Sequence, residues 1–231
     1  MEVILIPGFW LDASCWDNVV PALHDAGHRA SALTLPGLES RDADRSQIRL
    51  RDHVDAVIAA IDKADGQVVL VGHSGGGAIA NGAVDARPDR VARAIYVDSF
   101  PASDGMPIND EMEQVNGEIP LPDWSELPAE DLRDLDDDLR ERFRASAIPE
   151  PAGVACDPQV LSDDRRHEVP ATIICCEFTG EQLRDAISQN HPALAELAAM
   201  RNVDFVELPT GHWPQFTKPK ELAEALLSVI A

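Results

Sequence analysis

The sequence predicts an α/β fold in which a mostly parallel, doubly wound sheet carries a small helical cap over its carboxyl edge. Short apolar runs alternate with amphipathic stretches along most of the chain, which is typical of a parallel sheet covered on both faces. A glycine-rich turn, Gly72-His73-Ser74-Gly75-Gly76, joins one such run directly to a helix-like stretch. Residues 102–168, rich in proline and acidic residues, interrupt the alternation. We expect them to form the cap, because ligands bind at the carboxyl edge of open α/β sheets.

Each expected element has a local signal in the sequence. The first apolar run ends at Pro7-Gly8, and Gly27 stops the helix that follows it. The next helix carries apolar side chains three and four positions apart, and Pro88 closes the helix after the glycine-rich turn. The expected strands are Val3–Ile6, Ala30–Leu35, Gln67–Val71, Val91–Val97, Ala171–Cys176 and Val203–Leu208. The expected helices are Cys15–Ala26, Leu50–Lys63, Gly75–Arg87, Glu181–Ser188, Pro192–Ala199 and Pro219–Ile230, with short helical pieces within 131–145.

The bulk properties restrict the class of protein and its partners. With 231 residues, the chain suits a single α/β domain, 1–231, that contains the cap insertion 102–168. It begins in a strand, without the features of a signal peptide, and no run approaches the ~18 apolar residues of a membrane span. We therefore expect a cytoplasmic protein. A net charge of −22 argues against nucleic acid and anionic membranes as partners.

The four cysteines, Cys15, Cys156, Cys175 and Cys176, agree with a reducing compartment. Cys175 and Cys176 are neighbours in a predicted strand, so their side chains point to opposite faces and an ordinary disulfide between them is geometrically awkward. None of the four has the spacing of metal ligands. We expect buried thiols and no metal site.

Ser74 is the candidate nucleophile. It lies on the tight turn from strand to helix, where side chains two positions before and after it would collide, and Gly72 and Gly76 remove them. Such a turn holds the serine clear of the sheet edge, at a helix N-terminus whose amides favour a developing anion.

His212 is the candidate general base. A serine hydroxyl is a weak nucleophile at neutral pH and needs a base within hydrogen-bond reach. His212 lies in the loop that follows the last predicted strand, which places it at the same sheet edge as Ser74. Its ordinary pKa suits proton transfer near pH 7. His53 lies on an apolar helical stripe and is expected to be packed, and His73 is expected to face away from the base position.

The chain resembles the α/β-hydrolases over nearly its whole length, and it is similar to their small cytoplasmic esterase and lactonase branch. The glycine-serine turn and the C-terminal histidine are the more specific features. The resemblance implies that the backbone amides of Phe9 and Gly75 form the oxyanion hole. Pro7 stands where many relatives carry a histidine. The matching stretches are Ile6-Pro7-Gly8-Phe9-Trp10, Leu35-Pro36-Gly37, Gly72-His73-Ser74-Gly75-Gly76, Tyr96-Val97-Asp98-Ser99-Phe100-Pro101 with Asp104-Gly105, and Gly211-His212-Trp213-Pro214.

A catalytic triad consists of a serine, a histidine and an acid that orients the histidine. The sequence leaves open which residue is the acid that would join Ser74 and His212. Many relatives place it about three residues after the strand that here ends at Cys176, where this chain has Thr179. Asp98 directly follows the predicted strand Val91–Val97, which comes after the helix that follows the glycine-rich turn. Some hydrolases of this fold take their acid from that strand. Glu177 is the alternative acid, and a site with no acid is the third reading. We favour Asp98, although a strand-end aspartate also commonly caps local backbone amides.

Together these residues predict a serine hydrolase that cleaves a small neutral carboxylic ester or lactone through an acyl-enzyme, with no cofactor. We expect the substrate pocket to be lined by aromatic residues of the cap and of two loops: the oxyanion loop, which contains Phe9, and the loop that contains His212. These are Trp10, Phe100, Trp124, Phe143 and Trp213.

Two other functions stay open. A lyase of the hydroxynitrile-lyase type on the same fold uses the triad as acid and base, but usually needs an extra cation in the pocket, and the chain has no lysine between Lys63 and Lys218. A non-catalytic receptor for a small ligand is the third function. The assembly is also left open, with a homodimer as one option.

Overall fold

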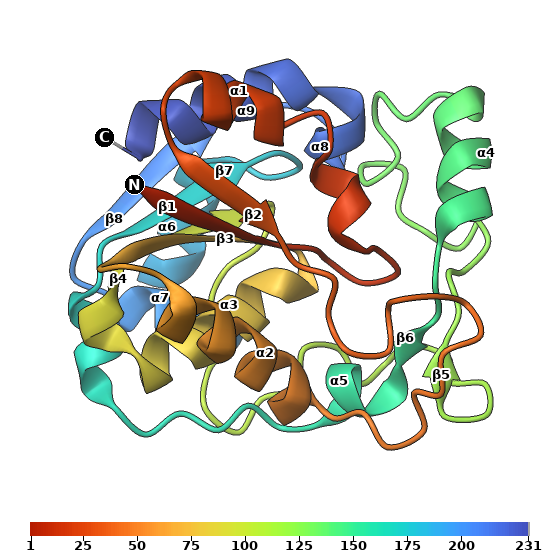
Figure 1. Ribbon diagram of the computed structural model, residues 1–231, viewed down its shortest axis with the longest axis horizontal. Coiled ribbons are helices and arrows are strands. Elements are labelled where there is room, and N and C mark those ends of the chain that lie inside the picture. The colour runs from red at the N-terminus through yellow and green to blue at the C-terminus, as the bar shows by residue number, and fades with distance from the viewer. Residues whose placement is uncertain (231) are drawn as a thin grey trace.

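The computed structural model describes residues 1–230, and a six-stranded parallel sheet forms its centre, in the order β2-β1-β3-β4-β7-β8 (Figure 1). The inner strand β3 is buried along its whole length, whereas the edge strands β2 and β8 contain no fully buried residue. Continuous burial requires the apolar run Val68-Val69-Leu70-Val71, because both faces are covered by helices. The strands are β1 Glu2–Ile6, β2 Arg29–Ala32, β3 Val68–His73, β4 Val91–Val97, β7 Ala171–Cys175 and β8 Val203–Glu207.

Helices cover both faces of this sheet, as predicted. Helices α1 (Val20–Asp25) and α9 (Pro219–Val229) lie on one face, and α2 (Leu50–Lys63) and α3 (Gly75–Ala86) pack against each other on the opposite face (Figure 1). After β7 come α6 (Gly180–Ser188) and α7 (Ala195–Ala199), and α8 (Pro214–Thr217) follows the last strand. The 3₁₀ turns are η1 Ala13–Trp16, η2 Pro88–Arg90, η3 Asp164–Glu168 and η4 Pro192–Leu194.

The predicted helix Cys15–Ala26 is wrong in one respect, because the structure divides it into η1 and α1. Pro21 lies in the first turn of α1. Proline lacks the amide hydrogen that would continue a helix from the preceding turn, but it fits the start of a new one. The apolar stripe still reaches the core, since Trp16, Val19 and Leu23 are fully buried.

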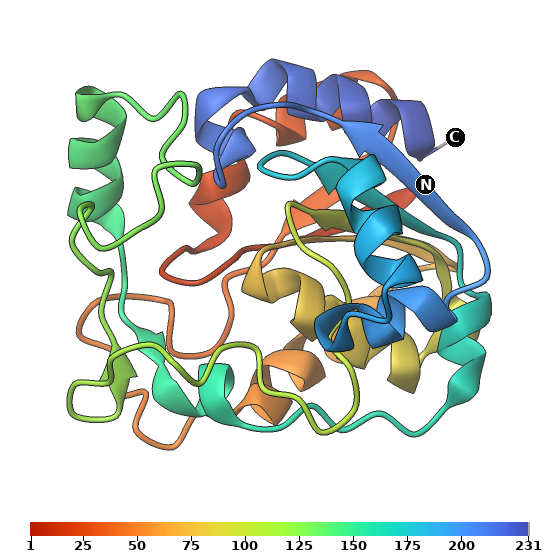
Figure 2. The same ribbon diagram turned by 180° about the vertical axis from the view of Figure 1, so that it is seen from behind.

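We call the whole stretch between β4 and β7, residues 98–170, the cap segment; it includes the predicted cap, 102–168. It contains a small antiparallel pair, β5 (Glu118–Ile119) with β6 (Glu150–Pro151), and the helices α4 (Asp137–Ser146) and α5 (Ala152–Cys156). Helix α4 lies at the end of the molecule opposite the two chain termini, in both views (Figures 1 and 2). The predicted short helical pieces within 131–145 overlap α4. Two-residue strands give no periodic signal in the sequence, so the rest of this part is predicted only as irregular.

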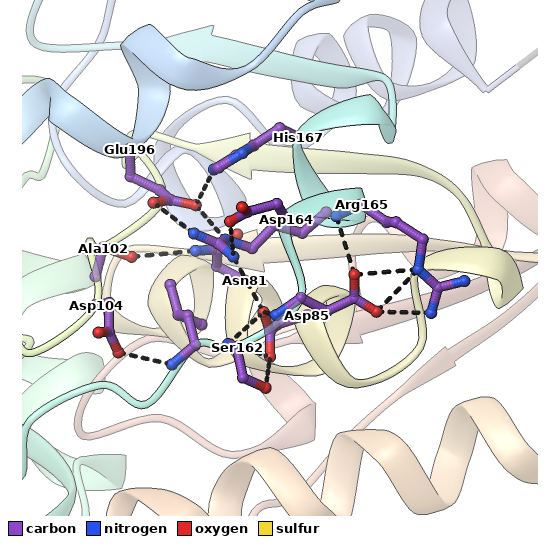
Figure 3. A network of polar contacts seen from close by, with 12 residues as sticks. Asn81, Asp85, Ala102, Asp104, Ser162, Asp164, Arg165, His167 and Glu196 are labelled. Carbon is purple, nitrogen blue, oxygen red and sulfur yellow. Dashed lines mark hydrogen bonds and ion pairs between the residues drawn. The ribbon is translucent and has the colours of Figure 1, made fainter.

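A buried polar network fastens the end of the cap segment to the main body (Figure 3). Arg166 in η3 is nearly inaccessible, and its guanidinium bonds to Glu196 of α7 at 2.6 Å and to Asp85 of α3 at 3.2 Å. Asp85 also accepts hydrogen bonds from the backbone amides of Ser162 and Asp163. Because Asp85 belongs to the helix that begins just after Ser74, the network anchors the returning chain directly to the nucleophile helix.

No helix within residues 1–230 combines the length and the apolar character that crossing a membrane would require.

Candidate active site

Ser74 occupies a strained backbone position between β3 and α3. Its φ of 52° and ψ of −127° lie outside the regions that L-residues normally adopt. A Cβ on Gly72 would lie 2.4 Å from the carbonyl oxygen of Gly76, and a Cβ on Gly76 would lie 2.4 Å from that of Pro7. Both glycines are therefore required by close backbone contacts, and the turn that they permit projects Ser74 from the carboxyl edge of the sheet.

His212 comes to Ser74 from the loop after β8. Its Nε2 lies 2.8 Å from Ser74 Oγ, within hydrogen-bond distance. Strands β3 and β8 are not neighbours in the sheet, but all parallel strands end at the same edge, so a loop from one can reach across to another.

His73 supports the His212 loop from inside the molecule. Burial, together with nearby His212, lowers the pKa of His73 to about 3, so its ring is neutral at physiological pH. Its Nε2 donates to the backbone oxygen of His212 at 2.6 Å, and its Nδ1 accepts from Gln215 Nε2 at 3.2 Å. The expectation that His73 faces away from the base is wrong, since its ring centroid lies 5.0 Å from that of His212, but both of its ring nitrogens are bonded to groups other than Ser74.

The cap segment also holds the His212 loop, a feature that sequence reasoning missed. The amide of His212 donates to the carbonyl of Asp131 at 2.9 Å, and the amide of Gly211 donates to that of Arg133 at 3.2 Å. A Cβ on Gly211 would lie 2.3 Å from the Asp131 oxygen. The Gly211-His212 pair in the sequence therefore reflects this close approach of two backbones.

Asp98 contacts the other side of the imidazole. Its Oδ2 lies 2.7 Å from His212 Nδ1, while its Oδ1 accepts hydrogen bonds from the amides of Cys176 and Glu177 at 3.0 and 3.1 Å. The side chain thus caps local backbone amides and also meets the histidine, so the two readings of Asp98 are compatible. Its φ of 45° lies in the left-handed region, as does that of Ser74.

Glu177 lies farther away and in a different environment. Its Oε1 is 3.6 Å from His212 Nδ1. The pKa of Glu177 is raised to about 8, chiefly by burial; the positive charge of protonated His212 lowers it, and the carboxylates of Asp98 and Asp131 raise it. Burial also raises the pKa of Asp131. Three carboxyl groups cannot all be ionised around one imidazole, and we assign the proton to the Glu177–Asp131 pair.

The pKa of His212 is raised. Burial opposes its charged form, but the hydrogen bond to Asp98 and the charges of Asp98, Glu177 and Asp131 outweigh that effect. This arrangement stabilises the imidazolium that forms when a serine proton is taken up.

The same side chains are the ones to consider for a metal. Ligand atoms of Asp98, Glu177 and His212 all lie within 4.8 Å of one another, in the described part of the chain. His212 Nδ1 must carry hydrogen to donate to Asp98, and a protonated nitrogen has no lone pair for a metal. The geometry therefore fits proton transfer better than metal binding.

Two backbone amides face the nucleophile region without a protein acceptor. Within residues 1–230, the amides of Phe9, after β1, and Gly75, at the start of α3, donate to no other residue. The two residues are in contact, since a Cβ on Gly75 would lie 2.6 Å from the Phe9 ring. A pair of free amides next to a serine is the arrangement that an oxyanion hole requires.

A cavity of about 470 Å³ opens beside Ser74. Phe100 lines it, as predicted, and so do Phe9, Met106, Ile108 and Met112. Among the residues of its wall, all within 1–230, there is no lysine, arginine or histidine, whereas Asp98, Asp110 and Glu111 contribute carboxylates.

The other aromatic residues expected at the pocket lie elsewhere. Trp124, Phe143 and Trp213 pack on one another with ring centroids 5.1 to 6.3 Å apart, and Trp10 is buried against the cap segment. None of the four lines the cavity beside Ser74. The sequence analysis predicted that these large aromatic side chains line the pocket. Instead, Trp124 and Phe143 of the cap segment pack against Trp213 of the His212 loop, and their large apolar area holds the two parts together.

Comparison with known proteins agrees with this geometry. The model of the "Alpha/beta hydrolase family" matches residues 3–225, nearly the whole chain. The chain belongs to the α/β hydrolase family. This α/β hydrolase is 29% identical to a pyrethroid hydrolase of Sphingobium wenxiniae, over 97% of this chain and 86% of that protein. It is 24% identical to methylesterase 7 of Arabidopsis thaliana, over 99% of this chain and 95% of that protein.

Solved structures share the fold of this α/β hydrolase. An extracellular α/β-hydrolase from a Paenibacillus species superposes with a TM-score of 0.76 at 22% identity, covering 99% of this chain and 98% of that one. The pyrethroid hydrolase PytH, as its S78A variant, superposes with a TM-score of 0.73 at 22% identity, covering 100% and 97% of the two chains.

Proposed function

We propose that this protein is a serine hydrolase that cleaves small neutral carboxylic esters or lactones through an acyl-enzyme. The observation that carries the proposal is the continuous hydrogen-bonded chain from Ser74 Oγ to His212 Nε2, at 2.8 Å, and from His212 Nδ1 to Asp98 Oδ2, at 2.7 Å. Full-length relatives named as a pyrethroid hydrolase and a methylesterase support ester chemistry.

In the proposed reaction His212 removes the proton of Ser74 as Oγ attacks the carbonyl carbon. The negative oxygen that forms is bound by the amides of Phe9 and Gly75, each donor typically contributing ~3 kcal/mol to transition-state stabilisation. His212 then gives its proton to the leaving alcohol. A water molecule repeats the sequence on the acyl-enzyme and releases the acid, which regenerates Ser74.

The cavity supports a neutral substrate. Its wall is largely apolar, and its three carboxylates together with the net charge of −22 oppose an anionic substrate. The extra cation that a hydroxynitrile-lyase reaction usually needs has no candidate among the lining residues in 1–230. Hydrolysis is therefore favoured over the lyase.

Ester hydrolysis by Ser74→Ala tests the proposal. We expect hydrolysis of p-nitrophenyl butyrate by the wild type, reduced more than about 10³-fold in Ser74→Ala. Ser228→Ala, on the exposed face of α9, is the matched control and should keep full activity. A fluorophosphonate should add covalently to the wild type and not to Ser74→Ala. Equal hydrolysis by wild type and Ser74→Ala would contradict the proposal, and a folded wild type without any esterase activity would favour the receptor.

We also propose a cytoplasmic location, a single domain 1–231 with 102–168 as its cap, and neither nucleic acid nor membrane as a partner. Four free cysteines support the location, and the net charge supports the exclusion of polyanions. A homodimer is retained as an assembly to test by light scattering.

A further inference from the structure

The residue after the Phe9 amide is held in an unusual conformation by the cap segment. Trp10 has a φ of 66°, which is rare for a bulky residue and is maintained only where surrounding contacts enforce it. Three hydrogen bonds do so. Its amide donates to Glu150 Oε2 at 3.3 Å, its indole Nε1 donates to the carbonyl of Ile119 at 3.0 Å, and its carbonyl accepts from Ile148 at 3.0 Å.

Glu150 is the only one of these three contacts that comes from an ionisable side chain. It is 1% exposed. Oε2 accepts from Trp10, but Oε1 has no hydrogen-bond partner in the described chain. Oε1 lies 3.8 Å from Nδ1 of His53. The His53 side chain is fully buried, and its Nδ1 also lacks a hydrogen-bond partner. Two unpaired polar atoms, both shielded from water, therefore face each other directly beneath the oxyanion loop.

One proton removes the repulsion between these two atoms, although their separation of 3.8 Å is longer than a hydrogen bond. His53 Nε2 lies 2.8 Å from the carbonyl of Pro36, and a carbonyl only accepts, so Nε2 carries the hydrogen and Nδ1 of the neutral ring is a lone pair. A proton on Glu150 Oε1 would point at that lone pair. Without it, a carboxylate would face a lone pair in a dry site, and both groups would be destabilised.

The surrounding charges place this proton on Glu150. Arg45 faces Glu150 and lowers its pKa, but the guanidinium is already bonded to Glu118 at 2.7 Å. Burial dominates and raises the pKa of Glu150 to about 8. Burial likewise lowers the pKa of His53 to about 4, despite the hydrogen bond to Pro36 and the charges of Asp52 and Glu39 that raise it. At neutral pH the pair is an uncharged acid and an uncharged imidazole.

We propose that Glu150 is a positioning residue of the oxyanion hole, which as a neutral carboxylic acid directs its Oε1 hydrogen toward His53 Nδ1, 3.8 Å away, and accepts the Trp10 amide at Oε2. This role rests on the proposed esterase function. The acid fixes the Trp10 backbone and with it the adjacent Phe9 amide. A neutral group also suits the place, because an ionised carboxylate would put a negative charge close to the oxyanion that the reaction forms.

The proposal predicts an alkaline loss of activity. Glu150 is protonated below its raised pKa, so kcat should fall as the pH rises through about 8 and the carboxylate forms. Glu150→Gln supplies an NH₂ group for His53 and a carbonyl for Trp10, and it cannot ionise. We expect its kcat on p-nitrophenyl butyrate to stay within about twofold of the wild type at pH 7 and to lack the alkaline decline.

Glu150→Ala removes the contact and should lower kcat about 10- to 100-fold at pH 7 with a smaller change in KM, as expected for a displaced oxyanion donor. Glu196→Gln is the matched control. Glu196 is also a buried glutamate, 5% exposed, but bonds to Arg166 away from the oxyanion loop, and its variant should keep the alkaline decline. If Glu150→Gln declines like the wild type, or if the wild type shows no decline between pH 7 and 9.5, the proposal is wrong.

A stability measurement separates this proposal from the esterase function. Between about 4.5 and 8, the ordinary and raised pKa values of Glu150, folded wild type binds a proton that the unfolded chain has released, so its stability falls as the pH rises. Glu150→Gln lacks this dependence, and its urea midpoint should fall less over that range. Identical pH dependence of the two midpoints would overturn the neutral Glu150 even if Ser74→Ala proves the protein to be an esterase. Esterase activity that survives in Ser74→Ala would instead overturn the proposed function.

Discussion

Two buried clusters in this molecule gather three carboxyl groups around one basic side chain, and they differ in whether that base titrates. Around Arg166 lie Asp85, Asp164 and Glu196. Around His212 lie Asp98, Glu177 and Asp131. Burial opposes the charge of Arg166, but the hydrogen bond and charge of Glu196, with Asp85 and Asp164, outweigh it and raise the pKa of the guanidinium. Arg166 therefore stays charged at every pH at which the protein is folded.

The histidine cluster has no such permanent cation. Burial raises the pKa values of Glu177 and Asp131, and the charge of the neighbouring Asp98 raises both further. Asp98 is distinguished by two backbone amides that donate to Oδ1 and fix its carboxyl group beside His212. The permanent charge of Arg166 suits its cluster to holding the structure together, whereas the titrating His212 allows its cluster to transfer protons.

The largest expected effect is on turnover, from Asp98→Asn. An asparagine would still accept the two backbone amides but would present an NH₂ group to His212 Nδ1, which favours the wrong tautomer for a base. We expect kcat to fall about 10⁴-fold with the fold retained, by analogy with other serine triads. Steady-state kinetics on p-nitrophenyl butyrate, with circular dichroism as the fold control, measure it. A decrease of less than tenfold would remove Asp98 from the catalytic role.

The second effect is on stability, from Arg166→Met. Removing the guanidinium leaves Asp85 and Glu196 buried without their cation, which should cost about 3–5 kcal/mol of unfolding free energy. Arg165→Ala is the adjacent control. Arg165 is 60% exposed and pairs with Asp163 and Asp89, so its loss should cost far less unfolding free energy than the loss of Arg166. Urea unfolding of both variants tests the contrast, and equal costs would show that the Arg166 cluster has no special structural role.

The smallest effect is expected from Glu177→Gln. Glutamine resembles the protonated glutamate that we assign to this position, so kcat should fall less than about tenfold. The acid limb of kcat/KM should lie above pH 6.5, because His212 must be unprotonated to act as base and its pKa is raised. Glu177→Gln should lower that midpoint by less than about one unit, since the stronger Asp98 contact remains. A larger effect from Glu177→Gln than from Asp98→Asn would reverse the assignment of the acid.

Much of the fold was predictable because its elements are encoded locally. The apolar run before Ser74 can only be a strand buried on both faces, and the glycines around Ser74 permit a turn that other residues would block. The helix at Leu50–Lys63 was predicted with its observed bounds. The division of the predicted helix Cys15–Ala26 at Pro21 was also visible in principle, since proline starts helices more readily than it continues them.

Parallel topology carried the prediction of the site. Ser74, Asp98, Glu177 and His212 each follow a predicted strand, and the carboxyl ends of parallel strands share one edge. The sequence could therefore bring all four together without saying which pair would touch. The choice between Asp98 and Glu177 depends on a difference between 2.7 and 3.6 Å and on the amides that point at Asp98, and neither follows from spacing along the chain.

Alternation of elements, the serine turn and the histidine after the last strand were thus properties of short stretches of sequence, and short stretches fold by local rules. The lining of the cavity, the burial of Glu150 against His53 and the aromatic packing of Trp213 were decided by the path of the cap segment. These features join residues that are far apart in the sequence, such as Phe9 and Ala193 in the wall of the cavity, and long-range contacts depend on the packing of the whole chain.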